Sequence, residues 1–565
     1  MTGKTWVVHA PNRDRQAALV QALSISPITA SVLLARGVVT EQEARAWLAP
    51  GSFHDPFLLP DMEKAVSRLH HAVTTGERVC FYGDYDVDGM AATSLYLRFF
   101  QGLGANATWY IPHRIGEGYG LNDKALNKLG QNGVRLLVTS DCGTTAHTQV
   151  DVATRSGMEV IITDHHQPDG RLPAAFAVLN PQRTDSAYPF PGLCSGGLAY
   201  KVAQAYAARF GTGDKALELL QDLVALATVA DVVPLQDENR LLVRRGLELI
   251  TRGSRCGLRA LKRVAGVDRA CTAGGVAFRL APRLNAAGRL ARADLGVRLL
   301  TTESDLEARE LAEQLERLNR ERQRIELDTT AEAVEAVGSA EPPAALVLWS
   351  RHWHLGVIGI VAARLVERYH RPAVVIAVNE EGIGKGSARS VPGLDLHQTL
   401  GQCQSLLEGF GGHRAAAGLT IRESNLMAFR ERFTRVVADW AGEQPQVPTL
   451  HVDAEVSLVE VDRRLVRELE MLHPHGAGNP EPTLAVKNLA ILDTRVVGDG
   501  HLKLTVRHRH SPAFESIGFR MGSLAGLGVS AQEPVDLAFV PELSSWNGLD
   551  RVQLRIRDVR TSQIS

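Results

Sequence analysis

Cysteine and long apolar runs are both scarce in this sequence. The six cysteines contain no CxxC pair, which argues against a zinc site or a redox couple. The longest apolar stretches, Leu223–Ala230 and Ala344–Trp349, are far shorter than the roughly 18 residues that cross a bilayer. Met1–Val20 shows no signal-peptide pattern. We therefore expect a cytoplasmic protein with no membrane association.

Net positive charge is also lacking. The formal net charge is −1, so any binding to nucleic acid must come from a local concentration of charge. One such concentration exists, because Arg252–Arg292 carries nine arginines and one lysine against a single acid, Asp268. A solvated face is the usual explanation of a charge run, but this segment is also a candidate for contact with phosphate.

The length of 565 residues and the 45% hydrophobic content predict several domains. From about residue 60 to 235, apolar β-branched runs alternate with helix-length segments, which indicates a parallel sheet covered by helices. Three runs, Arg78–Tyr82, Arg135–Ser140 and Met158–Thr163, are followed at once by acidic residues or histidines. Open α/β sheets bind ligands at the carboxyl ends of their strands, so the chemistry should lie there.

The rest of the chain predicts a second lobe and a barrel. Ser304–Val334 has the pattern of a long connecting helix, and strand-like Ala344–Trp349 and Ala373–Val378 flank a helical segment. Beyond a linker at Glu443–Pro448, alternating segments that include Leu450–Val461 predict a small antiparallel barrel. The expected parts are an N-terminal segment packing on the first lobe (1–59), the first lobe with the acidic strand ends (60–300), a connecting helix (301–338), a second lobe (339–442) and the barrel (449–565).

Three carboxylates, Asp84, Asp86 and Asp88, stand at alternate positions directly after the first strand. An EF-hand loop starting at Asp84 would need a glutamate at its twelfth position, where this chain has Leu95, so calcium is not expected. A solvated acidic turn is the plain alternative for this segment taken alone.

Three further segments favour a metal site. Asp141 follows the second strand, Asp164-His165-His166 follows the third, and Asp231 closes the apolar run Leu223–Ala230. Four buried acidic sites would repel one another unless cations neutralised them. Carboxylates with imidazoles favour Mn²⁺ or Mg²⁺, and a pair of such ions can hydrolyse a phosphodiester.

At this point the sequence resembles the DHH phosphoesterases, and among them the exonucleases that are specific for single-stranded DNA. The matching segments run in family order. They are Tyr82–Gly89, Asp141, Asp164–His166, Ala230–Leu235, Pro282–Arg289, Ser387–Ser390, Gly411–Gly418 and His475–Pro482. The resemblance implies two α/β lobes of the DHH and DHHA1 types joined by a long helix, followed by an OB-fold barrel.

The resemblance also implies a set of site residues. Two divalent cations, Mn²⁺ or Mg²⁺, would be held by Asp84, Asp86, Asp88, Asp141, His165 and Asp231. Asp141 would bridge the two ions, His166 would face the scissile phosphate, and Asp164 would orient the site. How Asp84 and Asp86 divide between ligand and support stays open.

Nine residues would contact the strand. They are Arg114, Arg283, Asn285, Arg289, Ser387, Arg389, Ser390, Gly412 and His413. By similarity, Arg114, Ser387 and Arg389 would form a pocket for a terminal 5′-phosphate. On the residues alone, the glycine-rich loop around Arg114 could be only a flexible loop, and Gly411-Gly412 could be only a tight turn. Candidates in the barrel, on pattern alone, are Lys503, Arg507, Arg509, Phe514, Phe519 and Arg520.

The expected function is therefore degradation of single-stranded DNA from 5′ to 3′, to 5′-mononucleotides, in DNA recombination and repair. No Walker or dinucleotide motif is present, so no ATP should be needed. Family resemblance implies cooperation with single-strand-binding protein and a DNA helicase, and we expect a monomer.

Two other functions fit part of the sequence. A DHH phosphodiesterase of oligoribonucleotides or cyclic dinucleotides would use the same metals, but the barrel and Pro282–Arg289 favour a longer strand. A noncatalytic DNA-binding scaffold in replication should have lost motif carboxylates, and this chain keeps all of them.

Overall fold

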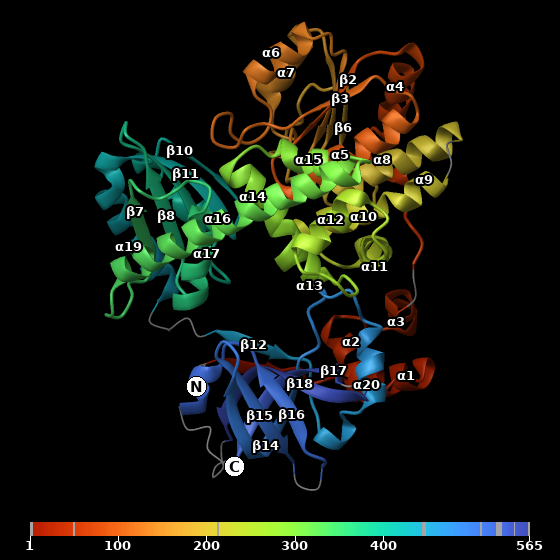
Figure 1. Cartoon of the computed structure of the whole chain (residues 1–565). Helices are drawn as coiled ribbons and strands as arrows, with labels where there is room; N and C mark the ends of the chain where they lie inside the picture. Colours follow the sequence, from red (N-terminus) through yellow and green to blue (C-terminus); the bar gives the residue numbers. More distant parts are fainter. Residues whose placement is uncertain are drawn as a thin grey trace. The chain divides into compact units, whose positions relative to one another are not determined.

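The computed structural model describes residues 4–48, 51–211, 214–442, 448–508, 511–526, 534–546 and 549–562. The chain divides into two compact units (Figure 1). The central unit is Phe53–Gln446, and the terminal unit combines both ends of the chain, Met1–Ser52 and Val447–Ser565. Each unit is described by itself below.

The first lobe of the central unit contains a five-stranded sheet whose pairings are all parallel, in the order β3-β2-β4-β5-β6. The strands are β2 (Val79–Gly83), β3 (Ala107–Tyr110), β4 (Leu136–Ser140), β5 (Glu159–Thr163) and β6 (Ala177–Leu179). The three predicted strands are thus confirmed as β2, β4 and β5. Each consists almost wholly of buried residues, as expected for a sheet covered on both faces.

Helices cover both faces of this sheet (Figure 1). Val79 and Phe81 of β2 belong to a core with helices α4, α5 and α8, whereas Cys80 and Tyr82 face α6 and α7. These helices are α4 (Met62–Thr75), α5 (Val87–Gly102), α6 (Asp123–Gln131), α7 (His147–Arg155) and α8 (Ser195–Phe210). The lobe continues through α9 (Asp214–Leu219), α10 (Gln221–Ala230), α11 (Asp237–Arg252), α12 (Cys256–Val264), α13 (Ala273–Gly275), α14 (Ala281–Leu290) and α15 (Asp294–Thr301).

The predicted connecting helix is confirmed as α16 (Asp305–Val337), which leads into the second lobe. Ser304 caps its first turn by accepting a hydrogen bond from the backbone of Glu307. The second sheet has the order β10-β11-β9-β8-β7, in which only β7 and β8 are parallel. Its elements are β7 (Leu346–Ser350), α17 (Ile358–Tyr369), β8 (Ala373–Val378), β9 (Ile383–Arg389), α18 (Leu396–Gly401), β10 (Gly409–Gly412), β11 (Ala416–Arg422) and α19 (Leu426–Ala441).

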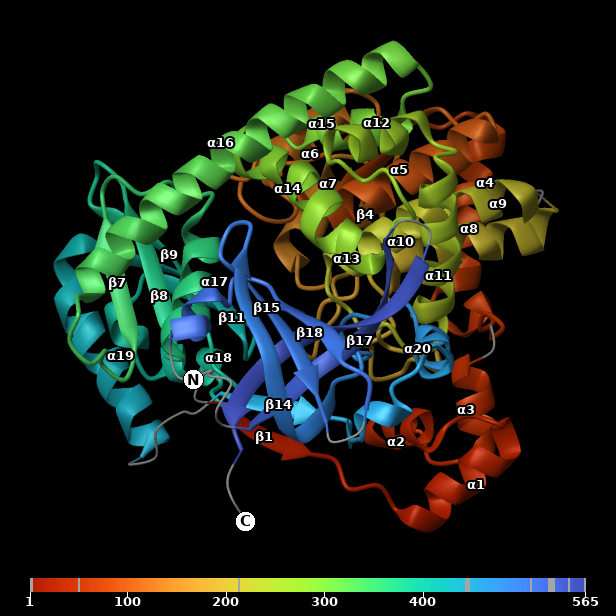
Figure 2. The same cartoon turned by 60° about the horizontal axis from the view of Figure 1, so that its bottom comes forward.

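The terminal unit is built on a barrel (Figure 2). Its strands follow the order β14-β15-β16-β18-β17, and β17 pairs back with β14. They are β14 (Leu484–Val497), β15 (His501–Arg507), β16 (Phe514–Gly518), β17 (Val535–Trp546) and β18 (Leu549–Thr561). The pairing of β16 with β18 is parallel, and the remaining barrel pairings are antiparallel. This arrangement matches the predicted OB-fold.

The N-terminal segment was predicted to pack on the first lobe, but Met1–Ser52 belongs to the same compact unit as the barrel. Strand β1 (Thr5–Val8) pairs in parallel with β12 (Thr449–Val452), and helices α1 (Arg13–Leu23), α2 (Pro27–Ala35) and α3 (Glu41–Leu48) belong to the terminal unit. Leu33 of α2 shares a hydrophobic core with Leu484 and Phe539 of the barrel. The apolar residues of a helix indicate that it is buried, but they do not identify the elements against which it packs.

The predicted strand Leu450–Val461 is also broken. It divides into β12, the short β13 (Ala454–Glu455) and a 3₁₀ turn, followed by α20 (Arg463–Glu470). Among the described helices none is alone long and apolar enough to span a bilayer; α1 and α2 meet that test only as a pair, bent by 118°.

Candidate active site

The acidic residues of the first lobe meet where its strands and helices end. Asp84 follows β2, Asp141 follows β4, and Asp164 follows β5, while Asp231 caps the C-terminus of α10. Asp86 is the N-cap of α5 and accepts hydrogen bonds from the backbone N–H groups of Asp88 and Gly89 at 2.9 and 3.1 Å. We call Asp84, Asp86, Asp88, Asp141 and Asp231 the carboxylate cluster.

Asp141 is held in an unusual backbone conformation, with φ of 67°. Such left-handed geometry costs a non-glycine residue on the order of 1–3 kcal/mol, so the surroundings must impose it. The backbone N–H of Asp141 donates to Thr163 O at 3.2 Å, and the Tyr119 hydroxyl donates to the Asp141 carbonyl at 2.9 Å. Ser195 Oγ lies 3.3 Å from Asp141 Oδ1.

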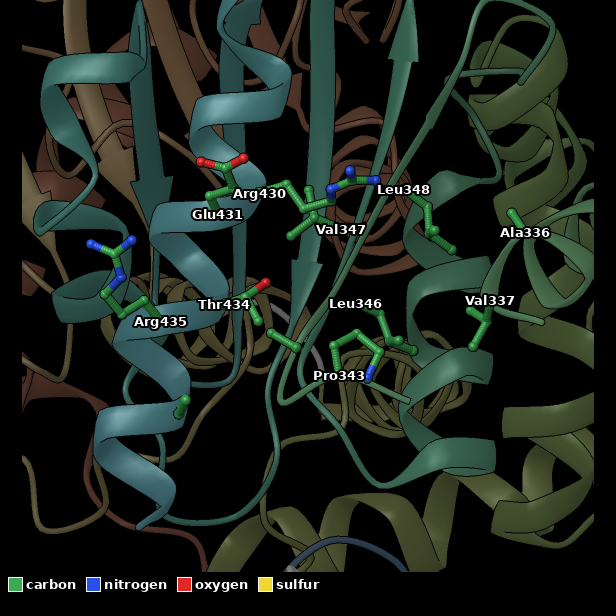
Figure 3. A pocket seen from close by; sticks show the side chains of 12 residues that line it. Ala336, Val337, Pro343, Leu346, Val347, Leu348, Arg430, Glu431, Thr434 and Arg435 are labelled. Atoms are coloured by element: carbon green, nitrogen blue, oxygen red, sulfur yellow. The ribbon is translucent and has the colours of Figure 1, made fainter. Parts of the chain in front are cut away.

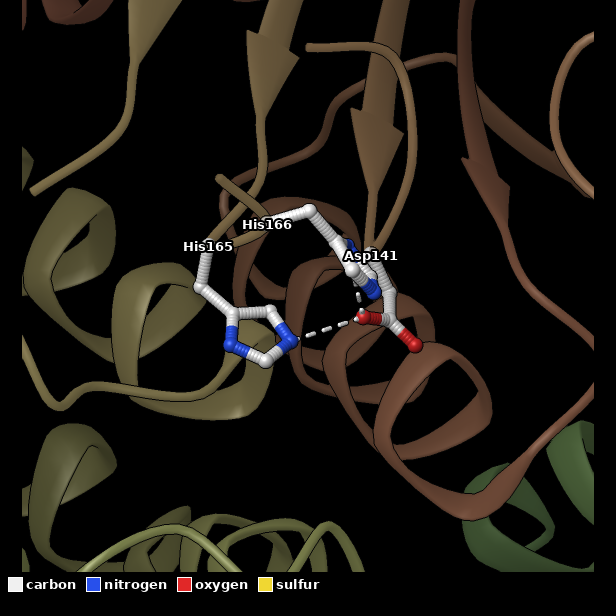
Figure 4. Close-up of side chains that lie close together, drawn as sticks. All are labelled: Asp141, His165 and His166. Atoms are coloured by element: carbon white, nitrogen blue, oxygen red, sulfur yellow. Dashed lines mark hydrogen bonds and ion pairs between the residues drawn. The ribbon is translucent and has the colours of Figure 1, made fainter. Parts of the chain in front are cut away.

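The imidazole of His165 lies among three carboxylates. Its Nε2 is 3.2 Å from Asp141, 3.5 Å from Asp231 and 3.7 Å from Asp88. Figure 4 shows both histidines directed at one carboxylate oxygen of Asp141, with His165 Nε2 at 3.2 Å and His166 Nδ1 at 4.0 Å. Three groups of ligand atoms are close enough to hold a cation: Asp84–Asp86–Asp141, Asp88–His165–Asp231 and Asp141–His165–His166.

Asp88 is fixed by the first turn of α8. Its two carboxylate oxygens accept hydrogen bonds from the backbone N–H groups of Ser195 and Gly196, each at 2.8 Å. Backbone N–H groups at a helix N-terminus stabilise negative charge, so these two hydrogen bonds fix the side chain and lower the pKa of Asp88, against the larger effect of burial, which raises it.

The cluster carries more negative charge than the described residues neutralise. Burial, with the charge of neighbouring carboxylates in addition, raises the pKa of Asp84, Asp88 and Asp141, and it raises the pKa of Asp231 to about 9. Asp84 Oδ1 and Asp231 Oδ2 are buried and accept no hydrogen bond from any described residue. Oxygen-rich sites in which buried carboxylate oxygens accept no hydrogen bond fit hard divalent cations such as Mn²⁺ and Mg²⁺.

His166 is held by Asp164. Its Nδ1 lies 2.7 Å from Asp164 Oδ1, and Asp164 also accepts hydrogen bonds from the backbone of His165 and Thr144. Burial alone would lower the pKa of His166, but the hydrogen bond and charge of Asp164 raise it to about 9. His166 is therefore a cation at neutral pH, and the contact fixes the orientation of its ring.

A second cluster, of guanidinium groups, lies where the two lobes of the central unit meet. Arg289 of α14 donates to Gly356 O of the second lobe at 3.0 Å. Burial and then the charges of Arg114, Arg322 and Arg389 lower the pKa of Arg289 to about 10. We call Arg114, Arg289 and Arg389 the arginine cluster; within the described chain none of the three forms an ion pair with a carboxylate.

Ser387 and Arg389 sit against the start of α17. Arg389 Nη1 donates to Ser387 Oγ at 3.1 Å. A Cβ at Gly359 would come within 3.0 Å of Ser387 Oγ and 3.2 Å of Arg389 Nη2, so only glycine allows this approach without displacing them. The first turn of α17 adds backbone N–H groups beside the arginine cluster, which favours an anion there.

His413, in the second lobe, faces His166 of the first lobe. Its ring lies 6.3 Å from the ring of His166, with an angle of 13° between their planes. Gly412, with φ of 136°, allows the tight turn before it, because a Cβ there would lie 2.5 Å from Ala416 O.

Three predicted contact residues instead make internal contacts. Arg283 pairs with Glu316 of α16 at 2.6 Å, and Asn285 Oδ1 accepts from the backbone N–H of Val87 at 3.2 Å. Ser390 Oγ lies within 3.1 Å of two backbone carbonyls of its own loop. Asn285 thus supports the loop that carries Asp84 and Asp86.

Much of the basic segment Arg252–Arg292 is neutralised within the protein. Five of its arginines form ion pairs: Arg252 with Glu248, Arg255 with Asp222, Arg259 with Asp305, Arg283 with Glu316, and Arg292 with Asp294. The sequence charge therefore overstates the surface available to phosphate.

Two supporting features were missed from the sequence. Tyr119 bonds to the Asp141 carbonyl and lies 3.3 Å from His166 Nδ1, although it is 53% exposed. The first turn of α8 holds Asp88 through backbone atoms, which residue types do not reveal. The sequence signal for the contact between α8 and Asp88 was Ser195-Gly196-Gly197 at the beginning of an apolar segment.

Other surfaces lie away from this site. A cavity of about 580 Å³ lies between the end of α16, β7 and α19, and Figure 3 shows Leu346, Arg430 and Arg435 on its walls. In the barrel, Lys503 pairs with Glu515, whereas Phe519 is 54% exposed beside the ring of His501. The candidate Arg509 lies outside the described residues.

Three family matches cover most of the chain. The N-terminal domain of the DHH family matches residues 78–228, the DHHA1 domain matches residues 343–439, and the RecJ OB domain matches residues 452–558. The single-stranded-DNA-specific exonuclease RecJ of Bacillus subtilis is 38% identical over 99% of this chain and 71% of its own length. RecJ of Dickeya dadantii is 36% identical over 92% of this chain and 94% of its own.

A crystal structure of RecJ from Thermus thermophilus in complex with Mn²⁺ matches 99% of this chain and 80% of its own, with a TM-score of 0.85 and 30% identity. The Mg²⁺ complex of the same protein matches with a TM-score of 0.79 and 29% identity. The fold and the class of cation are thus shared with these structures.

Proposed function

The chain belongs to the RecJ family of single-stranded-DNA-specific exonucleases, and we propose that it degrades single-stranded DNA from the 5′ end to 5′-mononucleotides. One observation carries the proposal. Within the central unit, a carboxylate cluster in which two buried oxygens accept no hydrogen bond lies beside an arginine cluster, and among the described residues no carboxylate forms an ion pair with these arginines. Divalent cations and a phosphate end supply the two missing partners.

The carboxylate cluster and His165 would hold the cations. Asp84 has a buried oxygen free for a ligand bond, whereas one oxygen of Asp86 already caps α5, so we assign Asp84 mainly to coordination and Asp86 to both roles. Asp141 belongs to two of the three ligand groups, which suits a bridge. Bound there, two cations would supply an activated water and stabilise the charge of the phosphoryl group.

The other residues act directly on the strand in this proposal. His166 is held as a cation by Asp164 and can stabilise the negative charge of the scissile phosphate beside Asp141. Arg114, Arg289 and Arg389, with Ser387, would bind a terminal 5′-phosphate and place the first phosphodiester at the cluster. His413 and Gly412 would contact the strand from the second lobe.

Further parts of the proposal rest on family membership alone. They are roles in recombination and repair, cooperation with single-strand-binding protein and a helicase, a monomeric state and a cytoplasmic location. Arg283, Asn285 and Ser390 would act mainly through their internal contacts.

The direct test is digestion of single-stranded DNA labelled separately at each end, with Mn²⁺, Mg²⁺ or a chelator. We expect release of the 5′ label first, as a mononucleotide, no cleavage in chelator, and resistance of a blunt duplex. Release of the 3′ label first would contradict the polarity. Faster hydrolysis of a cyclic dinucleotide or an oligoribonucleotide than of DNA would favour the alternative phosphodiesterase.

A further inference from the structure

One buried side chain, Asn239, joins two backbone segments near the carboxylate cluster. It lies in the first turn of α11 and is fully buried. Its Nδ2 donates hydrogen bonds to Gly192 O at 2.6 Å and to Pro234 O at 3.0 Å. An amide group carries two hydrogens on this nitrogen, so both bonds can exist together.

Each of these carbonyls stands close to a support of the cluster. Gly192 precedes by three residues the turn at Ser195, whose N–H holds Asp88 at 2.8 Å. Pro234 follows Asp231 by three residues, in the loop that connects α10 to α11. Asn239 therefore links the loop that follows Asp231 to the loop that precedes Ser195, whose N–H holds Asp88.

The two segments also approach each other on their helical side. A Cβ at Gly196 would lie 2.4 Å from Ala227 Cβ, so the start of α8 rests closely against α10. After Asp231 the chain leaves the helix abruptly through Val232, which has φ of 61° and is 70% exposed. The hydrogen bond from Asn239 to Pro234 O then fixes the loop between α10 and α11. The separation of Asp88 and Asp231 is therefore set both by the packing of α8 on α10 and by this loop.

Both ends of this tie lead to members of one ligand group, whereas Asp141 of the other groups is reached only through Ser195 Oγ, 3.3 Å from Asp141 Oδ1. Asp88 and Asp231 form the group that includes His165, whose Nε2 lies 3.7 and 3.5 Å from them. The group Asp84–Asp86–Asp141 stands on β2, α5 and β4, which Asn239 does not touch through any hydrogen bond that the structure describes.

We propose that Asn239 is a positioning residue that sets the separation of Asp88 and Asp231 and thereby the affinity of one of the two cation sites. The proposal rests on the proposed function, because it requires cations at the cluster. Residues that support metal ligands typically change metal affinity by about 10–100-fold when they are replaced.

The test is calorimetric titration of the metal-free full chain with Mn²⁺, without DNA. Asn239→Leu keeps the size of the side chain and removes both donors, and Asn239→Ser keeps at most one donor. The matched control is Asn425→Leu, because Asn425 Nδ2 also donates to a backbone carbonyl, Leu406 O at 3.1 Å, but in the second lobe. Thermal unfolding of each metal-free variant is measured in parallel.

We expect two binding events in the parent protein and in the control. In Asn239→Leu one event should weaken at least about tenfold while the other keeps its affinity, and Asn239→Ser should fall between. DNA cleavage by both Asn239 variants should recover at high Mn²⁺. If Asn239→Leu does not fold, the test rests on Asn239→Ser, in which one binding event should weaken while the other keeps its affinity.

Two results would overturn the assignment: unchanged affinity of both events in the Asn239 variants, or equal weakening of both with a lower unfolding temperature. A parent protein that binds no Mn²⁺ would overturn the proposed function itself, and the assignment with it. The parent titration thus separates the two failures.

Discussion

The carboxylate cluster and the arginine cluster are opposite in charge and differ in origin. The carboxylates stand at the ends of β2, β4 and α10 and at the start of α5, all in the first lobe. The arginines come from a loop of the first lobe, from α14 and from β9 of the second lobe. A single lobe contains the whole first cluster, whereas the meeting of two lobes creates the second.

Burial differs in the same way. Asp84, Asp88 and Asp141 are at most 3% exposed, whereas all three members of the arginine cluster remain partly exposed. A small ion can neutralise the first cluster, while the second can receive the larger end of a strand. Four changes would test this comparison.

The largest effect is expected at Asp141. Asp141→Ala should lower DNA hydrolysis by roughly a thousandfold, or about 4 kcal/mol of activation free energy, because no neighbour can replace a carboxylate shared by two ligand groups. Single-turnover cleavage in Mn²⁺ measures this. Asp151→Ala, at an exposed position of α7, is the control and should keep the parent rate. A variant that retains a tenth of the rate would refute the bridging role.

Addition of Mn²⁺ should stabilise the parent protein against heat. A free Mn²⁺ concentration of about 100 times the dissociation constant adds about 2.7 kcal/mol to the free energy of unfolding. The raised pKa of Asp231, about 9 against about 3.9 for a free aspartate, means that ionisation destabilises the cation-free protein as pH rises between these values. The gain from Mn²⁺ should therefore be larger at pH 8 than at pH 6, as measured by thermal unfolding. An equal gain at both pH values would contradict the electrostatic explanation.

Arg389→Ala should reduce the preference for a 5′-phosphorylated strand over a 5′-hydroxyl strand about tenfold, or about 1.4 kcal/mol. The reason is the loss of one guanidinium from a cluster in which no described carboxylate forms an ion pair. Both strands are digested side by side by the parent and the variant. Arg351→Ala, which removes an arginine paired with Glu423 in the same lobe, is the control. An unchanged ratio would exclude the pocket.

The smallest effect is expected for Arg283→Ala. Its partner Glu316 already occupies the guanidinium, so we expect a loss of about 1 kcal/mol in unfolding free energy and little change in strand affinity. Thermal unfolding and binding of a labelled strand separate the two effects. A tenfold loss of affinity at unchanged stability would place Arg283 in direct contact with DNA.

The sequence predicted the carboxylate cluster well, for a physical reason. Parallel strands end at the same edge of their sheet, so Asp84, Asp141 and Asp164 had to lie near one another once the strands were recognised. The arginine cluster was reached only through family resemblance. Nothing local indicates that Arg114 and Arg389, in different lobes, come together.

Other features depend on partners distant in the chain. Asn285 bonds to Val87 and Arg283 to Glu316, and residue type alone could not separate such internal contacts from contacts with DNA. The sequence predicted that the N-terminal segment packs against other parts of the chain, but not that α2 contributes to the core of the barrel.

The composition of the terminal unit has a consequence for biosynthesis. Its helices α1, α2 and α3 are made before the barrel strands that complete their core, which begin at Leu484. At about 5–20 residues per second, a ribosome needs on the order of half a minute or more to make the intervening chain. During that interval the central unit can fold as an uninterrupted segment. The apolar residues of α2 have no barrel to pack against until the later strands are made. We therefore expect the apolar surface of α2 to be open to chaperone binding until the barrel strands have been made.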